Sequence, residues 1–197
     1  MVKLMKALKK IAITTVILVF CLTPYSWVFH FLQVSDEPVK SDAIILFVGP
    51  DYDKRLKEAY QLMHEGYADT LIVPAYKLIF KMEQGDIVKD VNPAQFSFNR
   101  KAYPGFYENT HVEALEARKL MEEQGITSAI MVSDPLHMRR IKIISSRVFD
   151  KKRYRIRCIG SQYLRAQGFF STFRPQNVKF ALSEAVKIGS FWVYQLM

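Results

Sequence analysis

The sequence predicts a three-layer α/β domain built on a parallel sheet and preceded by one N-terminal transmembrane helix. Three observations predict this fold class. Short apolar runs alternate along the chain with longer segments whose apolar residues recur at helical spacing, as strands and helices do in a parallel sheet. Asp42–Val48 is apolar after its first residue, which is typical of a strand covered by helices on both faces. Ile11–Phe29 contains no charged residue over a length close to the roughly 20 residues that cross a bilayer as a helix.

The N-terminal region combines this uncharged stretch with four lysines, at positions 3, 6, 9 and 10, and has no acidic residue before Asp36. Positive charge ahead of an apolar helix predicts that the N-terminus lies in the cytoplasm. We therefore expect residues 1–34 to be a single-pass anchor in the cytoplasmic (inner) membrane. The membrane would be the partner of the Ile11–Phe29 helix, and the α/β domain would be extracytoplasmic. Residues 35–41 then form a polar linker.

Two other interpretations of the apolar stretch stay open. A cleaved signal peptide has a shorter apolar core and small residues at its cleavage site, and no such site follows Phe20. A buried core helix would not need lysines gathered at one end. Length and flanking charge favour the uncleaved anchor.

The first half of the domain, which is expected to span residues 42–197, begins with the pattern strand, helix, strand. Asp53 can cap the helix and Gly66 can end it. The expected elements are a strand over 42–48, a helix over 53–64, a strand over 70–73, a short helix over 78–83 and a strand around Phe96 and Phe98.

The second half continues the alternation. Thr110 and Glu113 have the spacing of a capping box, and Asp134 can cap a helix with Pro135 at its first position. The expected elements are a helix over 110–124, a strand over 128–133, a helix over 136–148, a strand over 153–159 and a helix over 177–196. The 153–159 strand alternates arginines with apolar residues, which indicates a place near the edge of the sheet. We expect the last helix to pack on the sheet, with contact to a membrane surface as the alternative.

Polar residues gather where the expected strands end. In an open parallel sheet, ligands bind beyond the carboxyl ends of the strands, so three loops should meet there. The candidate ligand-binding residues of these loops are Gly49, Asp51, Arg55, Asn109, Thr110 and Arg140, and the candidate catalytic residues are His137 and Glu113.

His137 and Arg140 share a helix face because they are three positions apart. His137 with Glu113 could perform general acid–base chemistry, and Arg55 and Arg140 could hold a phosphate together with helix N-terminal amides. The simpler interpretation of Thr110 and Glu113 is that they only cap a helix.

The composition limits other functions. The net charge is +9, but the four N-terminal lysines account for a large part of it, and the rest lacks the dense basic patch with interleaved aromatic residues that nucleic acid requires. We therefore expect no nucleic acid as partner and a phosphorylated or nucleotide-like small ligand instead. No ligand spacing for a metal is found, and no disulfide is expected between Cys21 and Cys158. The sequence identifies no cofactor and no protein partner in the envelope.

Three motifs resemble those of the YdcF/SanA/ElyC-like family of bacterial envelope proteins. They are D-A-I-I-L-F-V-G at 42–49, N-T-x-x-E-A at 109–114 and H-M-x-R at 137–140. The resemblance implies a Rossmann-like α/β domain and a role in the cell-envelope barrier or in peptidoglycan and lipid-carrier metabolism, without a defined reaction. It assigns the site to Gly49, Arg55, Asn109, Thr110, Glu113, His137 and Arg140.

The chain also departs from the family pattern. Pro74 and Ala75 stand where the family has two glycines, and Pro104 and Tyr107 stand where it has a glutamate and a serine. Two hypotheses follow. In the first, the domain binds a phosphorylated or sugar-linked ligand and acts on it. In the second, it is a non-catalytic binding or scaffold module whose site has degenerated and whose arginines at 153, 155 and 157 face anionic lipid or a wall polymer.

Overall fold

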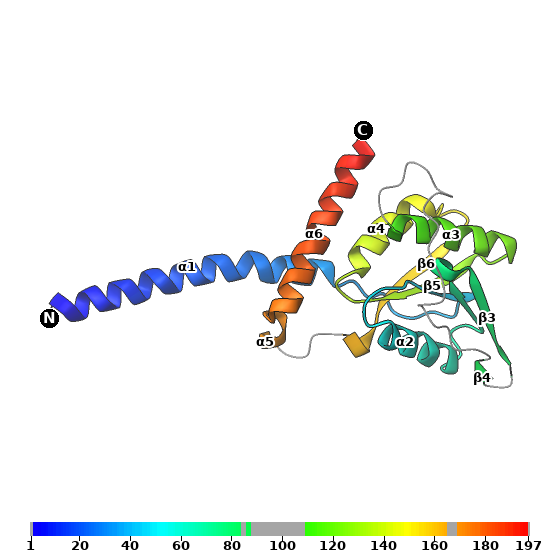
Figure 1. The fold of residues 1–197 in the computed structure, drawn as a ribbon, viewed down its shortest axis with the longest axis horizontal. Helices are drawn as coiled ribbons and strands as arrows, with labels where there is room; N and C mark the ends of the chain where they lie inside the picture. The colour runs from blue at the N-terminus through cyan, green and yellow to red at the C-terminus, as the bar shows by residue number, and fades with distance from the viewer. Residues whose placement is uncertain (1, 84–85, 88–108, 165–168, 197) are drawn as a thin grey trace.

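In the computed structural model the described residues are 2–83, 86–87, 109–164 and 169–196, and they form an α/β body from which the first helix projects (Figure 1). The body is a sheet whose strands have the order β4-β3-β2-β1-β5-β6. The elements are α1 (Val2–Leu32), β1 (Ala43–Leu46), α2 (Tyr52–His64), β2 (Thr70–Val73), the 3-10 helix η1 (Pro74–Tyr76), β3 (Leu78–Glu83), β4 (Asp86–Ile87), α3 (Asn109–Glu123), β5 (Ser128–Ser133), α4 (Met138–Val148), β6 (Arg155–Gly160), the 3-10 helix η4 (Gln162–Leu164), α5 (Phe169–Thr172) and α6 (Pro175–Leu196).

The centre of the sheet is parallel. β1 pairs with β2 on one side and with β5 on the other, and β5 pairs with β6. All residues of β1 and β5 are buried, as the unbroken apolar runs predicted. The chain winds outward from β1 to β2, then crosses back to β5 and continues to β6, so the winding reverses between β1 and β5. Such a reversal leaves a crevice at the carboxyl ends of the two strands.

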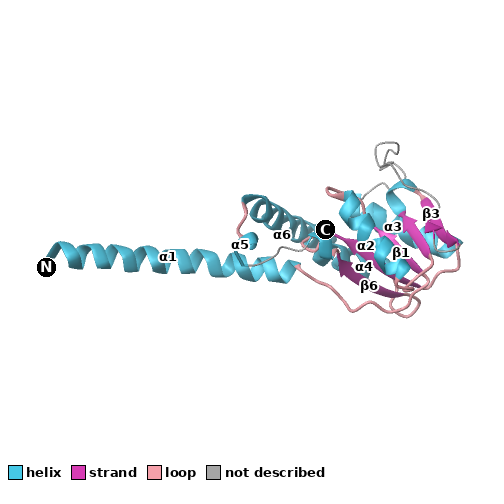
Figure 2. Ribbon diagram, turned by 90° about the horizontal axis from the view of Figure 1, so that it is seen from below, coloured by secondary structure: helices cyan, strands magenta, loops and turns pink. Residues whose placement is uncertain are grey.

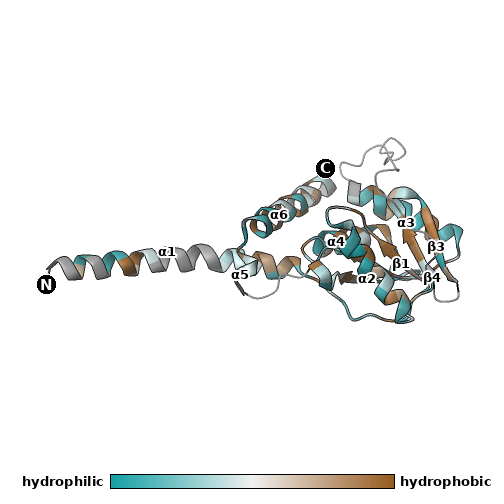
Figure 3. Cartoon of the chain, turned by 60° about the horizontal axis from the view of Figure 1, so that its bottom comes forward, coloured by the Kyte–Doolittle hydropathy of each residue, from teal (hydrophilic) through white to brown (hydrophobic). Residues whose placement is uncertain are grey.

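Helices cover both faces of this sheet, which gives the predicted three layers (Figure 2). One core cluster joins α3 and α4 to the sheet face that carries Ala43, Ile45 and Met131, and a second joins α2 to the opposite face with Ile44 and Ile130. In Figure 3 the strands in the middle of the sheet are largely brown, the colour of hydrophobic residues, and the helices around them carry both brown and teal residues. The fold is compatible with the Rossmann-like class.

The sheet is mixed, which corrects the prediction of a parallel sheet. β3 runs antiparallel to β2, and β4 runs antiparallel to β3. The short helix expected over Leu78–Glu83 is therefore wrong. η1 and the left-handed Lys77 (φ 54°) reverse the chain after β2, so the next apolar residues pair with β2. The strand expected around Phe96 and Phe98 lies outside the described residues.

α1 corrects the predicted fold class at the N-terminus. It is one helix from Val2 to Leu32, and among the described residues no helix is long and apolar enough to cross a membrane. The prediction of a transmembrane helix over Ile11–Phe29 is therefore wrong. The apolar residues at its end pack instead within the protein: Phe29 and Leu32 are buried in a cluster with Leu136 and Ala181.

α6 crosses the end of α1 and continues past α4 (Figure 1). Ala181, Glu184 and Phe191 on its inner face are fully buried, as expected for packing on the body, whereas Val186 and Trp192 are exposed. β6 is an edge strand, as its alternation predicted, with Arg155 and Arg157 exposed.

Candidate functional site

The site lies at the crevice between the carboxyl ends of β1 and β5. The loop after β1 contributes Gly49 and Asp51, and α2 contributes Arg55 from its first turn. The loop after β5 contributes Asp134, and α4 begins beside His137. α3 places Thr110 and Glu113 in the same region. The three loops that were predicted to meet at this edge of the sheet therefore do meet there.

Arg140 is held in the interior by a residue that sequence reasoning did not select. Its Nε donates to Oε2 of Glu184 at 2.7 Å, and its Nη2 donates to Oε1 at 3.2 Å. Glu184 is fully buried on α6 and also accepts a hydrogen bond from Lys187 at 3.0 Å. Burial opposes the charge of Glu184, but hydrogen bonds from His137 and Arg140 lower its pKa, so the carboxylate is ionised.

His137 lies between this carboxylate and a hydroxyl. Its Nδ1 is 3.0 Å from Oε2 of Glu184, and its Nε2 is 3.4 Å from Oγ1 of Thr110. Nδ1 also lies 2.9 Å from Nη2 of Arg140, so its role depends on the tautomer. A protonated Nδ1 donates to the ionised carboxylate and leaves Nε2 as the acceptor that faces Thr110, whereas an unprotonated Nδ1 accepts from Arg140. Burial lowers the pKa of His137 to about 4, and the charge of Arg140 adds to this effect, so the imidazole is neutral near pH 7.

Thr110 completes the cluster. Its Oγ1 accepts a hydrogen bond from Nη1 of Arg140 at 2.9 Å, which leaves its own proton to point at His137. Glu184, His137 and Thr110 therefore form a carboxylate–imidazole–hydroxyl chain in which Arg140 contacts all three. Such a chain can move a proton from the hydroxyl to the imidazole.

Arg55 forms a second buried group at the crevice. Its Nη1 donates to the carbonyls of Phe47 and Val48 at 3.2 and 3.1 Å, and to Oγ of Ser133 at 2.9 Å. It thereby ties the loop after β1 to the end of β5. Gly49 makes room for this guanidinium, because a Cβ there would lie 2.9 Å from Nη1 of Arg55 and the backbone has φ +153°.

Glu113 lies beside Arg55, and its pKa is strongly raised. Burial raises its pKa to about 8, against the charge of Arg55 and a hydrogen bond from the Val48 amide, so the group is protonated near pH 7. Among the described residues, Oε2 of Glu113 and Nε of Arg55 are buried polar atoms without a hydrogen-bond partner. Buried polar atoms are normally satisfied, so two such atoms together mark a site that is incomplete without a ligand or water.

A cavity of about 790 Å³ opens at this crevice, and we call it the carboxyl-edge cavity. Lys54, Arg55 and Arg174 give it three cations, and Asp51 and Asp134 give it two carboxylates. Lys54 is paired with Asp51 at 3.1 Å, and burial raises the pKa of Asp134. The first turns of α2 and α6 also line it, and helix N-termini attract anions.

The predicted site residues thus fall into two adjoining groups. Thr110, His137 and Arg140 are joined directly to one another, and Arg55 lies with Gly49 and Glu113. Asp51 lines the cavity mouth in a left-handed conformation (φ 56°). Asn109 is the first residue of α3, and its side chain is not described.

Two predicted caps, at Thr110 and Asp53, are wrong. α3 begins at Asn109, so Thr110 is inside the helix and binds Arg140 and His137 instead of capping. α2 begins at Tyr52, with Asp53 in its first turn. The prediction at Asp134 holds in part: its Oδ1 accepts the Leu136 amide at 2.8 Å, as a capping side chain does, but α4 begins at Met138 rather than at Leu136.

Glu184 had a signal in the sequence that was not used. Ala181, Glu184, Ile188 and Phe191 have the spacing of one helix face, so a carboxylate occupies a position in an apolar stripe. A buried acid requires a cation, and Arg140 is that cation.

Comparisons with protein-family models, with curated proteins and with solved structures give no match. The resemblance to the YdcF/SanA/ElyC-like family stays a prediction from the motifs. Within residues 2–83, 86–87, 109–164 and 169–196, no group of three His, Cys, Asp or Glu side chains could hold a metal ion. Cys158 is a free, buried thiol.

Proposed function

We propose that this chain is a cell-envelope protein whose α/β domain binds a phosphorylated small ligand in the carboxyl-edge cavity. The observation that carries the proposal is the meeting of Lys54, Arg55 and Arg174 with two helix N-termini around one cavity at the winding reversal of the sheet. Arg55 lines this cavity, and its Nε has no hydrogen-bond partner among the described residues, so its guanidinium has a donor left for phosphate or hydroxyl oxygens. The envelope role rests on the family resemblance.

A second candidate function is hydrolysis or transfer of that ligand. It is favoured by the chain Glu184–His137–Thr110, in which a neutral imidazole faces a hydroxyl that also contacts Arg140. Binding without chemistry is favoured by the position of the same residues, because His137 and Arg140 are engaged by Glu184 and neither lines the carboxyl-edge cavity. We therefore place binding first.

Binding can be tested by calorimetric titration of the full chain with glucose 1-phosphate, AMP and inorganic phosphate. Arg174→Gln should weaken binding at least about tenfold, because a charge-assisted contact to phosphate is lost. Arg147→Gln is the matched control, since this arginine is exposed on α4 and outside the cavity. Equal weakening by both variants, or no binding of any of the three probes, would overturn the proposal.

Chemistry can be tested separately with His137→Ala and Glu113→Ala in a strain lacking the native gene. If both variants restore a normal envelope at normal protein levels, catalysis at this site is excluded and only binding remains. Loss of function in both, with ligand binding retained, would favour the second candidate.

We further propose that the α/β domain lies on the extracytoplasmic side. The family resemblance supports this placement. A reporter fused after Met197 should then be active outside the cytoplasm, and activity inside the cytoplasm would contradict the placement.

A further inference from the structure

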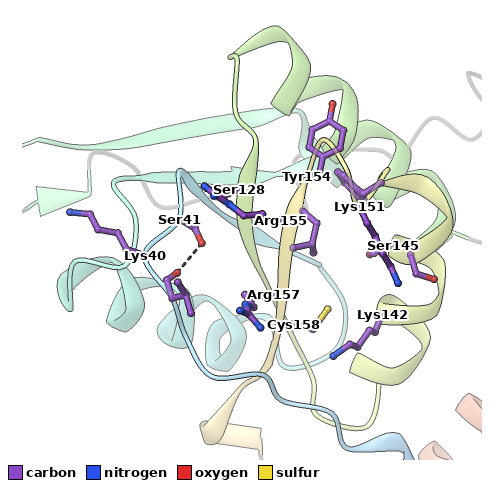
Figure 4. A pocket seen from close by; sticks show the side chains of 14 residues that line it. Lys40, Ser41, Ser128, Lys142, Ser145, Lys151, Tyr154, Arg155, Arg157 and Cys158 are labelled. Atoms are coloured by element: carbon purple, nitrogen blue, oxygen red, sulfur yellow. Dashed lines mark hydrogen bonds between the residues drawn. The ribbon is translucent and has the colours of Figure 1, made fainter.

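A second cavity, of about 580 Å³, lies along the outer edge of β6, and we call it the β6 cavity. Figure 4 shows its construction: the linker before β1 forms one wall, α4 forms the other, and β6 runs between them. Ser128 and Arg155, the first residues of β5 and β6, line it. It therefore reaches the amino ends of the strands, whereas the carboxyl-edge cavity lies beyond their opposite ends.

The charge of this cavity has one sign. Five cations line it and no acidic residue does; they are Lys40, Lys142, Lys151, Arg155 and Arg157. Lys142 is neutralised by Asp36, whose carboxylate lies 2.6 Å from its Nζ. The other four have no ion pair with a described acidic side chain, although Arg157 contributes its charge to lowering the pKa of Asp36. Like charges gathered without acids raise the local concentration of anions.

The interior of the cavity is apolar. Phe149, Tyr154 and Cys158 are buried where they line it, and Val39 is 47% exposed at its rim. Burial raises the pKa of the Cys158 thiol to about 12, so this part of the wall carries no charge. The hydroxyls of Ser41, Ser145 and Ser146 also line the cavity, but they donate to Val39, Met131 and Ile143 within the protein, so the cations are the donors for a ligand's oxygen atoms.

We propose that the β6 cavity binds an anionic amphiphile, a molecule that joins a phosphate group to an apolar body. The four cations without acid partners would hold the phosphate, and Phe149, Tyr154 and Val39 would contact the apolar body. The volume is in the range of sites for small ligands, about 300–1,000 Å³. A bare phosphate would leave the apolar interior empty, and a neutral apolar molecule would leave the cations without a counter-ion.

The edge of β6 is already closed to a further strand at this point. The Asp36 amide donates to the Cys158 carbonyl at 2.8 Å, and Oδ2 of Asp36 accepts the Cys158 amide at 3.0 Å. The linker therefore occupies this part of the edge as a wall, which leaves the cavity to a small molecule rather than to an added peptide strand.

The test is calorimetric titration of the full chain carrying Arg174→Gln, in which phosphate binding at the carboxyl-edge cavity is weakened, with n-octyl phosphate, inorganic phosphate and n-octyl glucoside, each below its micelle concentration. We expect saturable binding of n-octyl phosphate with one equivalent, and at least about tenfold weaker binding of the other two probes. Equal affinity for inorganic phosphate, or for n-octyl glucoside, would overturn the proposal.

Variants locate the binding. Arg155→Gln with Arg157→Gln should weaken binding of n-octyl phosphate at least about tenfold, whereas Arg147→Gln, an exposed arginine of α4 outside the cavity, should leave it unchanged. Ser146→Trp should also weaken it, because it fills the cavity from an exposed helix position without changing the charge. Thermal unfolding of each variant checks folding. Equal weakening by Arg147→Gln, or full binding by Ser146→Trp, would overturn the proposal.

A membrane surface is the competing source of the same headgroup chemistry. Vesicles of phosphatidylcholine with a minor fraction of phosphatidylglycerol test whether the protein binds a membrane surface or a soluble amphiphile. Capture by these vesicles that depends on Arg155 and Arg157, together with no binding of soluble n-octyl phosphate, would overturn the cavity proposal. Binding of n-octyl phosphate that is unchanged when vesicles of phosphatidylcholine alone are present supports the cavity proposal.

Discussion

Glu184 on α6 and Arg140 on α4 form a bidentate ion pair in the interior, with N–O distances of 2.7 and 3.2 Å. Their side chains are 0% and 6% exposed. The pair ties the last helix of the chain to the helix that follows β5, and it holds Oε2 of Glu184 against the ring of His137. The last helix therefore orients the ring of the best catalytic candidate.

Replacing Glu184 tests this pair. Glu184→Gln keeps the shape and removes the charge, so Arg140 would be left buried with no carboxylate. Removal of one partner of a buried pair costs about 3–5 kcal/mol, and we expect that loss in the free energy of unfolding measured by urea titration. Lys119→Gln, which removes an exposed pair with Glu123, should change it by less than about 0.5 kcal/mol. A loss below about 1 kcal/mol for Glu184→Gln would contradict the pair's structural role.

The stability of the protein should depend on the protonation of Glu113. Its pKa is about 8 in the folded state against 4.5 for the ordinary group, so between these values the folded chain holds a proton that the unfolded chain lacks. Stability therefore falls as pH rises through this window. His137, with its pKa lowered from 6.5 to about 4, gives the opposite slope, but only below about pH 6.5.

We therefore expect the free energy of unfolding to fall by about 1–2 kcal/mol between pH 6.5 and 8. Glu113→Gln should remove this fall, and Glu123→Gln, at an exposed position of the same helix, should retain it. Urea titrations across this pH range measure how the free energy of unfolding of each variant changes with pH. An unchanged slope in Glu113→Gln would place the titrating group elsewhere.

Gly49 should be required for the position of Arg55. Gly49→Ala meets both an unfavourable φ of +153° and a contact of 2.9 Å with the guanidinium, so we expect a loss of about 2–3 kcal/mol in the free energy of unfolding. Gly66→Ala has φ +79° and no neighbouring atom within 4 Å, so it isolates the backbone effect at about 1 kcal/mol. Equal losses of stability in the two variants would show that the Arg55 guanidinium moves away from the added Cβ at no cost in free energy.

Cys158 should be unreactive in the folded protein. Burial raises the pKa of its thiol to about 12 and leaves it 2% exposed, so the thiolate that reacts with a disulfide reagent is scarce and shielded. In a Cys21→Ser background, we expect no colour with Ellman's reagent at neutral pH in the native state and one equivalent in denaturing urea. Rapid native reaction would mean that the region around β6 opens readily.

Much of the fold could be predicted because its signals are local. The unbroken apolar runs predicted β1 and β5, and helical spacing predicted α2, α3 and α4 within a few residues. β3 was missed because Leu78–Glu83 has no helix-specific or strand-specific period, and only its antiparallel pairing with β2 decides it. The cap at Thr110 failed because its hydroxyl accepts a hydrogen bond from Arg140 and faces His137, and the cap at Asp53 failed because α2 begins one residue earlier, at Tyr52.

The sequence by itself determined the alternation of strands and helices from β1 to β2 and from α3 to β6, the edge position of β6 and the residues that gather at the carboxyl ends of the strands. These follow from periodicity and from the geometry of parallel sheets, which act over short stretches of chain. Tertiary structure alone decided that α6 supplies Glu184 to Arg140 and His137, 44 and 47 residues away, and that the end of α1 packs beneath Leu136. Long-range burial decides such pairings, since an ionised side chain enters the interior only where a partner from another element meets it.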